Sequence, residues 1–417
     1  MDTHKTIIER IDQMEREIIL RTQEYVRYPS VSGAENAAQM YIADRMRDLG
    51  MEVDMWDPLL ADAAMNPYFI CERTDFSGSP NVVGVLKGSG GGRSLIINGH
   101  VDVVPAGHND WNADPFSGKH EDGRIYGRGS SDMKGGFIAG LMAVKALCDL
   151  GISLSGDLIL QSVIGEETGG IGTLSAIKRG YKADAAIVPE PTDMKICPAS
   201  IGAMWFRITV KGRSAHAATA HFGVSAILKS VKVIEALREL EARRNGANRH
   251  PLYQESPTPF ALTVGKIKGG VFPTNVPEET VLEGRMAIMP GEELAAARKL
   301  LEDTVREAAN GDSWMTEHQP LVEWFGFAFH SNEIQHDHDL VKALQKNYAV
   351  VCGKQGIVTG TPWGTDAAAT TLFSKTPAVV FGPGPGESAH KANEYLDVSQ
   401  LMDTCKIMAL SILDWCK

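Results

Sequence analysis

Acidic and imidazole side chains follow three strand-like segments of this sequence, each near the point where the segment ends. The apolar segments are 94–98, 157–164 and 184–188. The side chains that come next are those of His100, Glu166, Glu167 and Glu190. Because ligands of open α/β sheets collect outside the carboxyl ends of the strands, we expect these side chains to share one site. Histidine and carboxylate groups together bind divalent metal ions, so the pattern predicts a metal site.

Glu166 and Glu167 place two adjacent carboxylates at the end of a buried strand. Like charges at such a position are unfavourable unless a cation offsets one of them. In a metal hydrolase, one carboxylate of such a pair binds the metal and the other takes a proton from the attacking water. Asp102 comes two residues after His100 and could accept the second ring N–H of this histidine, which would orient the ring.

Asp132 lies in a glycine-rich stretch just before a predicted helix at 133–149. It could cap that helix, as Ser131 could equally well. Alternatively, its carboxylate bridges two metal ions. The neighbouring glycines, at 127, 129, 135 and 136, indicate close backbone packing that a simple cap does not need. His390 follows Gly-Pro-Gly-Pro-Gly (382–386), where a histidine taken alone has the features of an ordinary surface residue.

Six sequence motifs resemble those of one known enzyme family. They are NGHVDVVPAG (98–107), YGRGSSDMKGG (126–136), GEETGG (165–170), VPEPT (188–192), GRSAHA (212–217) and AHKANE (389–394). In this order they are similar to motifs of the dinuclear zinc aminoacylases and carboxypeptidases, which include acetylornithine deacetylase, succinyl-diaminopimelate desuccinylase and glutamate carboxypeptidase. The resemblance covers nearly the whole chain and implies a dinuclear metal amidohydrolase that acts on linear amides.

The resemblance also implies a role for each residue of the predicted site. The residues that would hold the two divalent metal ions are His100, Asp132 and Glu190 for one ion and Asp132, Glu167 and His390 for the other. Asp132 would bridge the ions, and its peptide bond to Met133 would be cis. Asp102 would orient His100, and Glu166 would act as the general base and later as the acid. Zinc is the expected metal, although cobalt or manganese can occupy the same ligand set.

Four further positions match residues that bind substrate in the family. His216 matches a histidine that enters the active site of the partner subunit and stabilises the oxyanion, which implies a homodimer. Asn275 and Arg285 match residues that hold a substrate carboxylate in several relatives. Gly384 matches a loop on the opposite side of the same pocket. The expected ligand is therefore a small molecule that carries a carboxylate.

The segments that must position these residues predict an α/β fold. The first third of the chain alternates strand-like and helix-like segments, with helices near 5–27 and 34–49, which is typical of a largely parallel sheet. We expect the second of these helices to end at Gly50, as a glycine C-cap would end it. Within residues 201–329 the order becomes β-α-β-β-α-β, the ferredoxin-like arrangement. The resemblance implies a zinc-dependent exopeptidase-like catalytic domain (1–200 and 330–417) and an inserted lid and dimerisation domain (201–329). Residues 57–80 show little periodicity, and we expect them to form a long loop.

The composition is that of a soluble, acidic, cytoplasmic protein. The 417 residues carry a net charge of −11, and no Lys/Arg run interrupts this balance, which argues against nucleic-acid binding. No apolar stretch reaches the roughly 18 residues that span a bilayer, so no membrane partner is expected. The six cysteines are scattered and form no CxxC pair, which favours a reducing compartment.

The main functional prediction is deacylation of an N-acyl amino acid or related N-acyl amine, as in acetylornithine deacetylase. Two alternatives use the same site: a dipeptidase or carboxypeptidase, and a deformylase or deacylase of an amine that is not an amino acid. A non-catalytic, metal-stabilised binding protein is disfavoured because the ligands and the base are all present. A nucleotide-dependent oxidoreductase is excluded because GSGGGR (88–93) precedes a strand and does not join a strand to a helix.

Two other groups of residues need an interpretation. His336 and His338 have the spacing of metal ligands, but they lie in a polar stretch that we expect to cap a helix starting near 339. Trp363, Thr365 and Asp366 fall where relatives line the pocket, so we expect a substrate role there.

Overall fold

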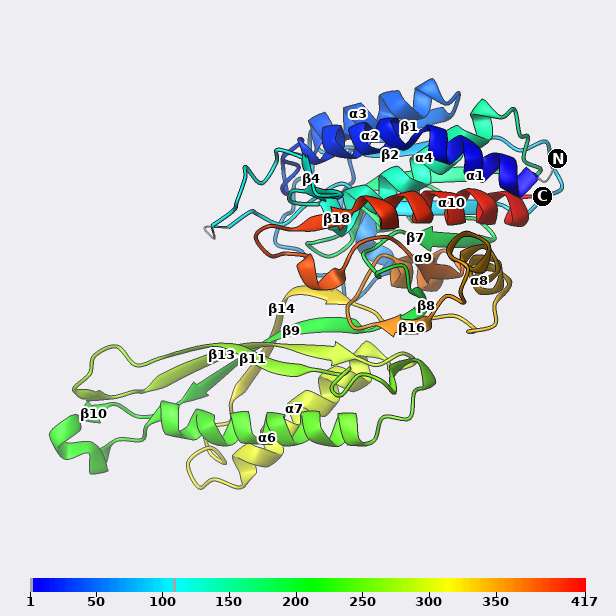
Figure 1. Cartoon of the computed structure of the whole chain (residues 1–417). Coiled ribbons are helices and arrows are strands. Elements are labelled where there is room, and N and C mark those ends of the chain that lie inside the picture. Colours follow the sequence, from blue (N-terminus) through cyan, green and yellow to red (C-terminus); the bar gives the residue numbers. More distant parts are fainter. Residues whose placement is uncertain (1–2, 108–109) are drawn as a thin grey trace.

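Two layered units, each built around its own sheet, make up the protein (Figure 1). The computed structural model describes residues 3–107 and 110–417. The larger unit has a nine-stranded sheet in which β16 (Val358–Thr361) pairs with β8 beside the main path. In spatial order the other strands are β1 (Glu52–Trp56), β2 (Asn81–Leu86), β6 (Leu158–Val163), β3 (Leu95–His100), β7 (Ala185–Val188), β17 (Ala378–Val380), β8 (Ile196–Ser200) and β15 (Asn332–Glu333).

The centre of this sheet is parallel and its edges are largely antiparallel. Strand β3 runs parallel to both β6 and β7, and β17 runs parallel to β7. The strands β1 and β2 at one edge, and β8 and β15 at the other, each have antiparallel neighbours. The predicted α/β fold is confirmed, with a sheet that is mixed overall. The parallel strands lie at its centre, where their carboxyl ends share one edge.

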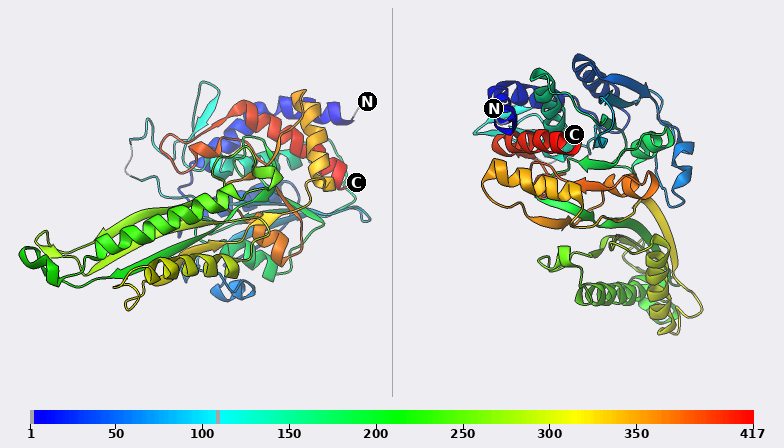
Figure 2. Two further views of the ribbon diagram at one scale, coloured as in Figure 1. Left: turned by 90° about the horizontal axis from the view of Figure 1, so that it is seen from below. Right: turned by 90° about the vertical axis from the view of Figure 1, so that its right-hand side faces the viewer.

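Helices cover both faces of the large sheet (Figures 1 and 2). One face packs against α4 (Gly135–Asp149) and α10 (Val398–Trp415), and the other packs against α9 (Ala367–Phe373) and α5 (Ile171–Lys178). Because both faces are covered, the central strands are apolar throughout, with Leu95 and Ile97 in one core and Ile96 in the other. The remaining helices of this unit are α1 (Thr3–Gln13), α2 (Glu15–Val26), α3 (Asn36–Asp48) and α8 (Asp339–Cys352).

Two expectations for the N-terminal helices have different outcomes. The single helix predicted for 5–27 is two helices, because the backbone leaves helical geometry at Met14, with φ −90° and ψ 1°. The helix end predicted at Gly50 is confirmed. Gly50 has a φ of +74°. The N–H groups of Gly50 and Met51 donate to the carbonyls of Arg47 and Met46, which is a Schellman C-cap.

The smaller unit is a four-stranded antiparallel sheet with two helices on one face. Its main elements, in chain order, are β9 (Gly202–Lys211), α6 (Ala226–Gly246), β11 (Leu262–Gly269), β13 (Glu279–Ile288), α7 (Leu294–Asn310) and β14 (Leu321–Phe329). The β-α-β-β-α-β chain order, with spatial order β11-β13-β9-β14, is the predicted ferredoxin-like arrangement. We call this unit the lid; the domain boundaries at 200/201 and 329/330 stay a prediction.

The lid presents different faces to its helices and to the larger unit. Helices α6 and α7 pack on one face of its sheet and bury Met204, Phe206 and Ile208. The helix-free face turns towards the larger unit (Figures 1 and 2). At the end of the lid far from the larger unit, β10 (Ala215–His216) pairs with β12 (Asn275–Val276), next to the turn η3 (Ala217–Phe222). A further short turn, η4 (Pro251–Tyr253), follows α6.

A small sheet joins the last part of the chain to the segment before α4. It consists of β18 (Tyr395–Asp397), β5 (Arg124–Tyr126) and β4 (Lys119–Glu121). This pairing brings the turn η5 (Gly386–Ser388) and the loop after it close to η2 (Ser130–Lys134), the single turn that precedes α4. Within residues 3–107 and 110–417, no helix combines the length and the apolar character that crossing a membrane requires.

Residues 57–80 form a long loop, as predicted, with one short turn, η1 (Leu60–Met65). The loop contacts both units. Arg73 pairs with the buried carboxylate of Glu35 at 3.0 Å in the larger unit. The guanidinium of Arg298, in α7 of the lid, lies 4.9 Å from the ring centre of Tyr68. The 57–80 loop therefore ties the larger unit to the lid.

Candidate dimetal site

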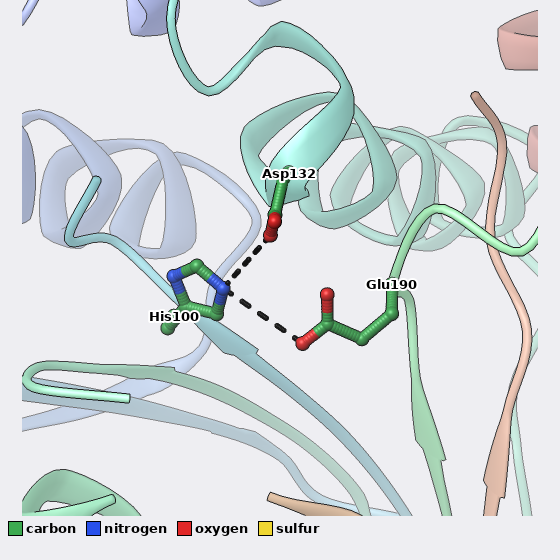
Figure 3. Close-up of side chains that lie close together, drawn as sticks. All are labelled: His100, Asp132 and Glu190. Atoms are coloured by element: carbon green, nitrogen blue, oxygen red, sulfur yellow. Dashed lines mark hydrogen bonds and ion pairs between the residues drawn. The ribbon is translucent and has the colours of Figure 1, made fainter. Parts of the chain in front are cut away.

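The three parallel strands β3, β6 and β7 deliver the predicted ligands to one edge of the sheet. His100 is the last residue of β3, Glu190 lies two residues beyond β7, and Glu166 and Glu167 lie in the turn after β6. The carboxyl ends of neighbouring parallel strands meet at the same edge, which is why these residues come together. Figure 3 shows the side chains of His100, Asp132 and Glu190 pointing towards one another.

The candidate ligands form two groups that share Asp132. The first consists of His100, Asp132 and Glu190, and the second of Asp132, Glu167 and His390. Within each group the potential ligand atoms lie within 4.8 Å of one another. Asp132 directs one oxygen to each group: Oδ1 lies 3.2 Å from Nε2 of His100, and Oδ2 lies 3.3 Å from Nε2 of His390. This is the arrangement that a bridging carboxylate needs.

The site gathers hydrogen-bond acceptors and negative charge. Nδ1 of His100 lies 2.8 Å from the backbone carbonyl of Asp102, which can only accept, so Nδ1 carries the proton in the neutral ring and Nε2 is left as an acceptor. That acceptor faces carboxylate oxygens of Asp132 and Glu190 at 3.2 and 3.8 Å. In the described part of the chain, no Lys or Arg pairs with these carboxylates. Divalent cations suit such a donor set.

The pKa values of the buried groups reflect the same surplus of negative charge. Burial raises the pKa of Glu166, and the charge of Glu190 adds to the effect. Burial and the charge of Asp132 raise the pKa of Glu190 in the same way. Burial would lower the pKa of His100, but its hydrogen bond to Asp132 and the charge of Glu166 raise that pKa well above its usual value. Cations at this place would offset the repulsion between the carboxylates.

Asp102 orients His100 through a different group from the one expected. Its backbone carbonyl, and not its carboxylate, accepts the hydrogen bond from the imidazole. The carboxylate instead accepts hydrogen bonds from the backbone N–H groups of Glu166 and Glu167, at 3.3 and 3.1 Å. Burial raises the pKa of Asp102 to about 7. Asp102 therefore holds both the histidine at the end of β3 and the turn after β6 that carries the two glutamates.

Sequence reasoning missed one residue that positions Asp132. Glu394 is buried, and its carboxylate accepts hydrogen bonds from the backbone N–H groups of Gly129, Ser131 and Asp132 at 3.1, 3.0 and 3.1 Å. The guanidinium of Arg128 donates to the same carboxylate at 2.6 Å. The sequence did contain a signal for this residue, because Glu394 is the last residue of the AHKANE motif that also contains His390.

The backbone around Asp132 is as closely packed as its glycines suggested. The peptide bond from Asp132 to Met133 is cis. A Cβ on Gly136 would lie 1.9 Å from the carbonyl oxygen of Pro189, the residue before Glu190. Only glycine lets the start of α4 approach the loop after β7 this closely, so Asp132 and Glu190 are held near each other. Gly384 lies against the same turn, since a Cβ there would come 2.3 Å from Oγ of Ser131.

The predicted substrate-binding residues lie in two places. Arg285 lines the cavity that contains the candidate ligands, and its guanidinium has no hydrogen-bond or ion-pair partner among the described residues. His216 and Asn275 instead face each other across β10 and β12 at the far end of the lid, where both are exposed. The structure does not bring these two residues to the site of their own chain.

The cavity measures about 470 Å³, which is in the range of roughly 300–1,000 Å³ that is usual for small-molecule sites. Trp363 lines it, as expected, whereas Thr365 and Asp366 are buried and do not line it. Asp366 accepts a hydrogen bond from Thr173 at 2.7 Å, and burial raises its pKa to about 6.

His338 caps α8 by accepting the N–H of Leu340, which confirms the structural role expected for it.

Comparison with known proteins agrees with this geometry. The profile of peptidase family M20/M25/M40 matches residues 96–414. N-formyl-4-amino-5-aminomethyl-2-methylpyrimidine deformylases from Halalkalibacterium halodurans and Bacillus subtilis are 34% and 33% identical to this chain. The alignments cover 98% of this chain and 97% and 96% of those proteins. Among solved structures, the dipeptidase Dug1p from Saccharomyces cerevisiae has a TM-score of 0.78 at 14% identity, with 99% of this chain and 98% of that chain covered, which shows a common fold.

The family match explains why two ligand groups share one aspartate. Dinuclear metal binding is found in this family, and the described residues supply two candidate groups of ligands at one edge of the sheet. The family profile covers most of the chain, and the relatives at 34% and 33% identity remove an acyl group from an amine. The chain therefore belongs to peptidase family M20/M25/M40 and is a metal-dependent amide hydrolase of the deacylase type.

Proposed function

We propose that this enzyme removes a formyl group from a primary amine that is not an amino acid. The observation that carries this proposal is the end-to-end similarity to two deformylases of a formylated aminomethylpyrimidine. This substrate class was among the alternatives drawn from the sequence, behind N-acyl amino acids. A formyl group is the smallest acyl group, so most of the cavity would be available to the amine half of the substrate.

The residues of the site divide the work as follows. His100, Asp132 and Glu190 would hold one divalent ion, and Asp132, Glu167 and His390 would hold the other. Zinc is the proposed metal, with cobalt or manganese as alternatives for the same ligands. Bound at this place, the two ions would supply a lowered pKa for a water molecule and polarisation of the amide carbonyl. Glu166 takes the proton from the attacking water and later gives it to the nitrogen of the leaving amine.

The active unit is a homodimer in this proposal. His216 donates a hydrogen bond to the oxyanion, a contact of a kind that contributes about 3 kcal/mol to lowering the barrier. His216 lies at the far end of the lid, away from the candidate ligands of its own chain, which supports a role in the site of a second copy. Asn275 faces His216 and would enter that site with it.

A cytoplasmic location is part of the proposal and agrees with the six free cysteines.

A second candidate, deacylation of an N-acyl amino acid, is favoured by Arg285. This guanidinium lines the cavity with no partner among the described residues, and a substrate carboxylate would supply one. Gly384, in the loop against the Asp132 turn, would lie on the other side of such a substrate.

A turnover panel with metal analysis tests the proposal. The purified protein would be assayed with N-formyl aminomethylpyrimidine, N-acetyl and N-succinyl amino acids, and dipeptides. We expect two divalent ions for each chain and the highest kcat/KM for the formylated amine. Faster turnover of an N-acyl amino acid would favour the second candidate. A protein with full metal occupancy that cleaves none of these amides would contradict both.

A further inference from the structure

Aromatic side chains gather on the helix-free face of the lid sheet. In β9 the side chains alternate, so that Met204 and Phe206 are buried under the helices of the lid while Trp205 points to the opposite face. Trp205 is 36% exposed, which is high for a tryptophan in the middle of a sheet. It lines the cavity that contains the candidate metal ligands. The lid therefore turns a large aromatic surface towards the reaction site.

A bulge in β14 extends this surface. The pairing of β14 with β9 slips between Phe325 and Ala328, which leaves Gly326 and Phe327 without a partner in β9. Gly326 has a φ of +72°, and a Cβ there would lie 2.2 Å from the Trp205 ring. Glycine at this position thus allows the tryptophan to lie against the bulge.

The bulge brings three rings into contact. The Phe327 ring lies 4.7 Å from that of Trp205, centre to centre, and 5.2 Å from that of Phe329. All three rings line the same cavity. Edge and tilted contacts of this kind leave ring faces available to a further aromatic group.

The larger unit adds a fourth ring. Trp363 lines the cavity and packs on Gly386, where a Cβ would come 2.4 Å from the indole. The neighbouring Gly364 packs closely on Phe329, because a Cβ added at Gly364 would lie only 2.9 Å from the Cβ of Phe329. The indole N–H groups of Trp205 and Trp363 have no hydrogen-bond partner in the described part of the chain. The cavity therefore offers planar apolar faces from both units.

We propose that Trp205, Phe327 and Phe329 bind a flat aromatic ring carried by the leaving amine and so determine the substrate specificity of this enzyme. The inference rests on the proposed deformylase function and adds the residues that recognise the amine. An aromatic ring gains stacking contacts here that a saturated ring of similar size does not, because only the planar ring has a quadrupole and can lie flat on its neighbours.

The test compares N-formylbenzylamine with N-formylcyclohexylmethylamine, which have the same carbon skeleton but carry a planar aromatic ring and a saturated ring, respectively. We expect the native enzyme to prefer the aromatic formamide by about tenfold in kcat/KM, the equivalent of one strong aromatic pair. Phe327→Leu and Trp205→Leu should reduce this preference strongly, whereas Phe327→Tyr, which keeps the ring, should retain it. Trp324→Leu is the matched control, because Trp324 lies on the same strand as Phe327 but packs against the core under the lid helices and does not line the cavity.

A binding measurement separates this inference from the proposed function. The free amines benzylamine and cyclohexylmethylamine would be titrated into the metal-loaded enzyme while tryptophan fluorescence is recorded. Selective binding of benzylamine, lost in Phe327→Leu, supports the aromatic surface even if no formamide is cleaved, an outcome that would contradict only the deformylase proposal. Cleavage of both formamides with equal kcat/KM, or equal losses for both in Trp205→Leu and Phe327→Leu, overturns the aromatic surface and leaves the deformylase proposal intact.

Discussion

The carboxylate of Glu394 accepts a hydrogen bond from the backbone N–H of Asp132, 3.1 Å away. The same oxygen accepts the N–H of Ser131, and the other oxygen accepts the N–H of Gly129 and a guanidinium N–H of Arg128. All its partners are donors, so only an ionised carboxylate satisfies every contact. Glu394 thus fixes the turn from which Asp132 reaches both ligand groups.

Replacing Glu394 with Gln should weaken metal binding and leave the fold intact. The new amide group would direct a donor at backbone N–H groups or at Arg128, which leaves buried donors unpaired. We expect metal affinity to fall by roughly 10- to 100-fold, as for other residues that hold ligands in place. Titration of the metal-free protein with Zn²⁺ measures this change. Glu317→Gln, an exposed site in the lid, is the control, and equal affinities in the two variants would refute the positioning role.

Metal affinity should rise with pH because of His390. Hydrogen bonds to Asp132 and Glu167 raise the pKa of His390 from 6.5 to about 10 in the metal-free protein. The protonated ring therefore stabilises the metal-free fold fully below pH 6.5, and this contribution is lost as the pH rises through about 10. A metal needs the neutral ring, so binding at pH 8 must release a proton. Calorimetry in two buffers of different ionisation enthalpy detects this release. His336→Gln should leave it unchanged, and its absence in the native protein would rule out His390 as a ligand.

Two inactive variants should restore activity to each other if His216 acts in the partner subunit. In a mixture of Glu166→Gln and His216→Ala chains, each heterodimer has one site with an intact base and an intact partner histidine. Random pairing then gives about a quarter of native activity. Activity is measured after the separately purified chains are unfolded and refolded together. Mixing Glu166→Gln with His100→Ala is the control and should restore none. No recovery in the first mixture would place His216 in its own subunit's site or outside catalysis.

Arg285→Met should discriminate between the two candidate substrate classes. If Arg285 holds a carboxylate, the KM for N-acyl amino acids rises by roughly 10- to 100-fold, the value of a charge-assisted contact, while neutral formamides are much less affected. Burial lowers the pKa of Arg285, and no described counter-charge opposes this, so the variant should also be thermally more stable. Steady-state kinetics with both substrate classes and a thermal unfolding scan measure these effects. Equal changes in KM for both classes would argue against carboxylate recognition.

The 57–80 loop should stabilise the protein through Tyr68. Arg298 lies between the rings of Tyr68 and Trp324, and two of its guanidinium nitrogens are buried without a hydrogen bond. Tyr68→Ala removes one of these rings and should lower the free energy of unfolding by roughly 1–2 kcal/mol. Tyr68→Phe keeps the ring and should be neutral. Urea denaturation and limited proteolysis of the loop measure the effect, and equal stability of the two variants would show that the contact contributes nothing.

The sequence predicted the parts of the site that follow from strand ends. Glu190 could be placed because an apolar run ending at a polar residue marks both the strand and the edge of the sheet where that residue emerges. Contacts between segments that are far apart in the sequence could not be predicted in this way. Glu394 reaches the Asp132 turn only because β18 pairs with β5, and nothing in the residues 395–397 specifies that partner.

The other differences between the sequence-based predictions and the structure also arise from tertiary contacts. The role of the Asp102 carbonyl depends on backbone direction after β3, which residue types do not encode. The aromatic cluster of the lid depends on a bulge at Gly326 that shifts Phe327 out of register with β9. Alternation along residues 321–329 places Phe327 and Phe329 on one face of the sheet, but it does not predict the bulge that brings Phe327 against Trp205.

The position of β17 bears on how the enzyme is made. This strand lies between β7 and β8, although the entire lid is synthesised after those two strands and before β17 itself. During translation the lid can therefore fold while the larger sheet still has an open gap, and exposed strand edges of this kind are prone to aggregation. The first ligand group ends at Glu190, which follows β7, but the second needs His390, which follows β17, so only the second group waits until the ribosome has made nearly the whole chain. Formation of the complete dimetal centre is then among the last steps of biogenesis, and a chain terminated after the lid would lack the second ligand group.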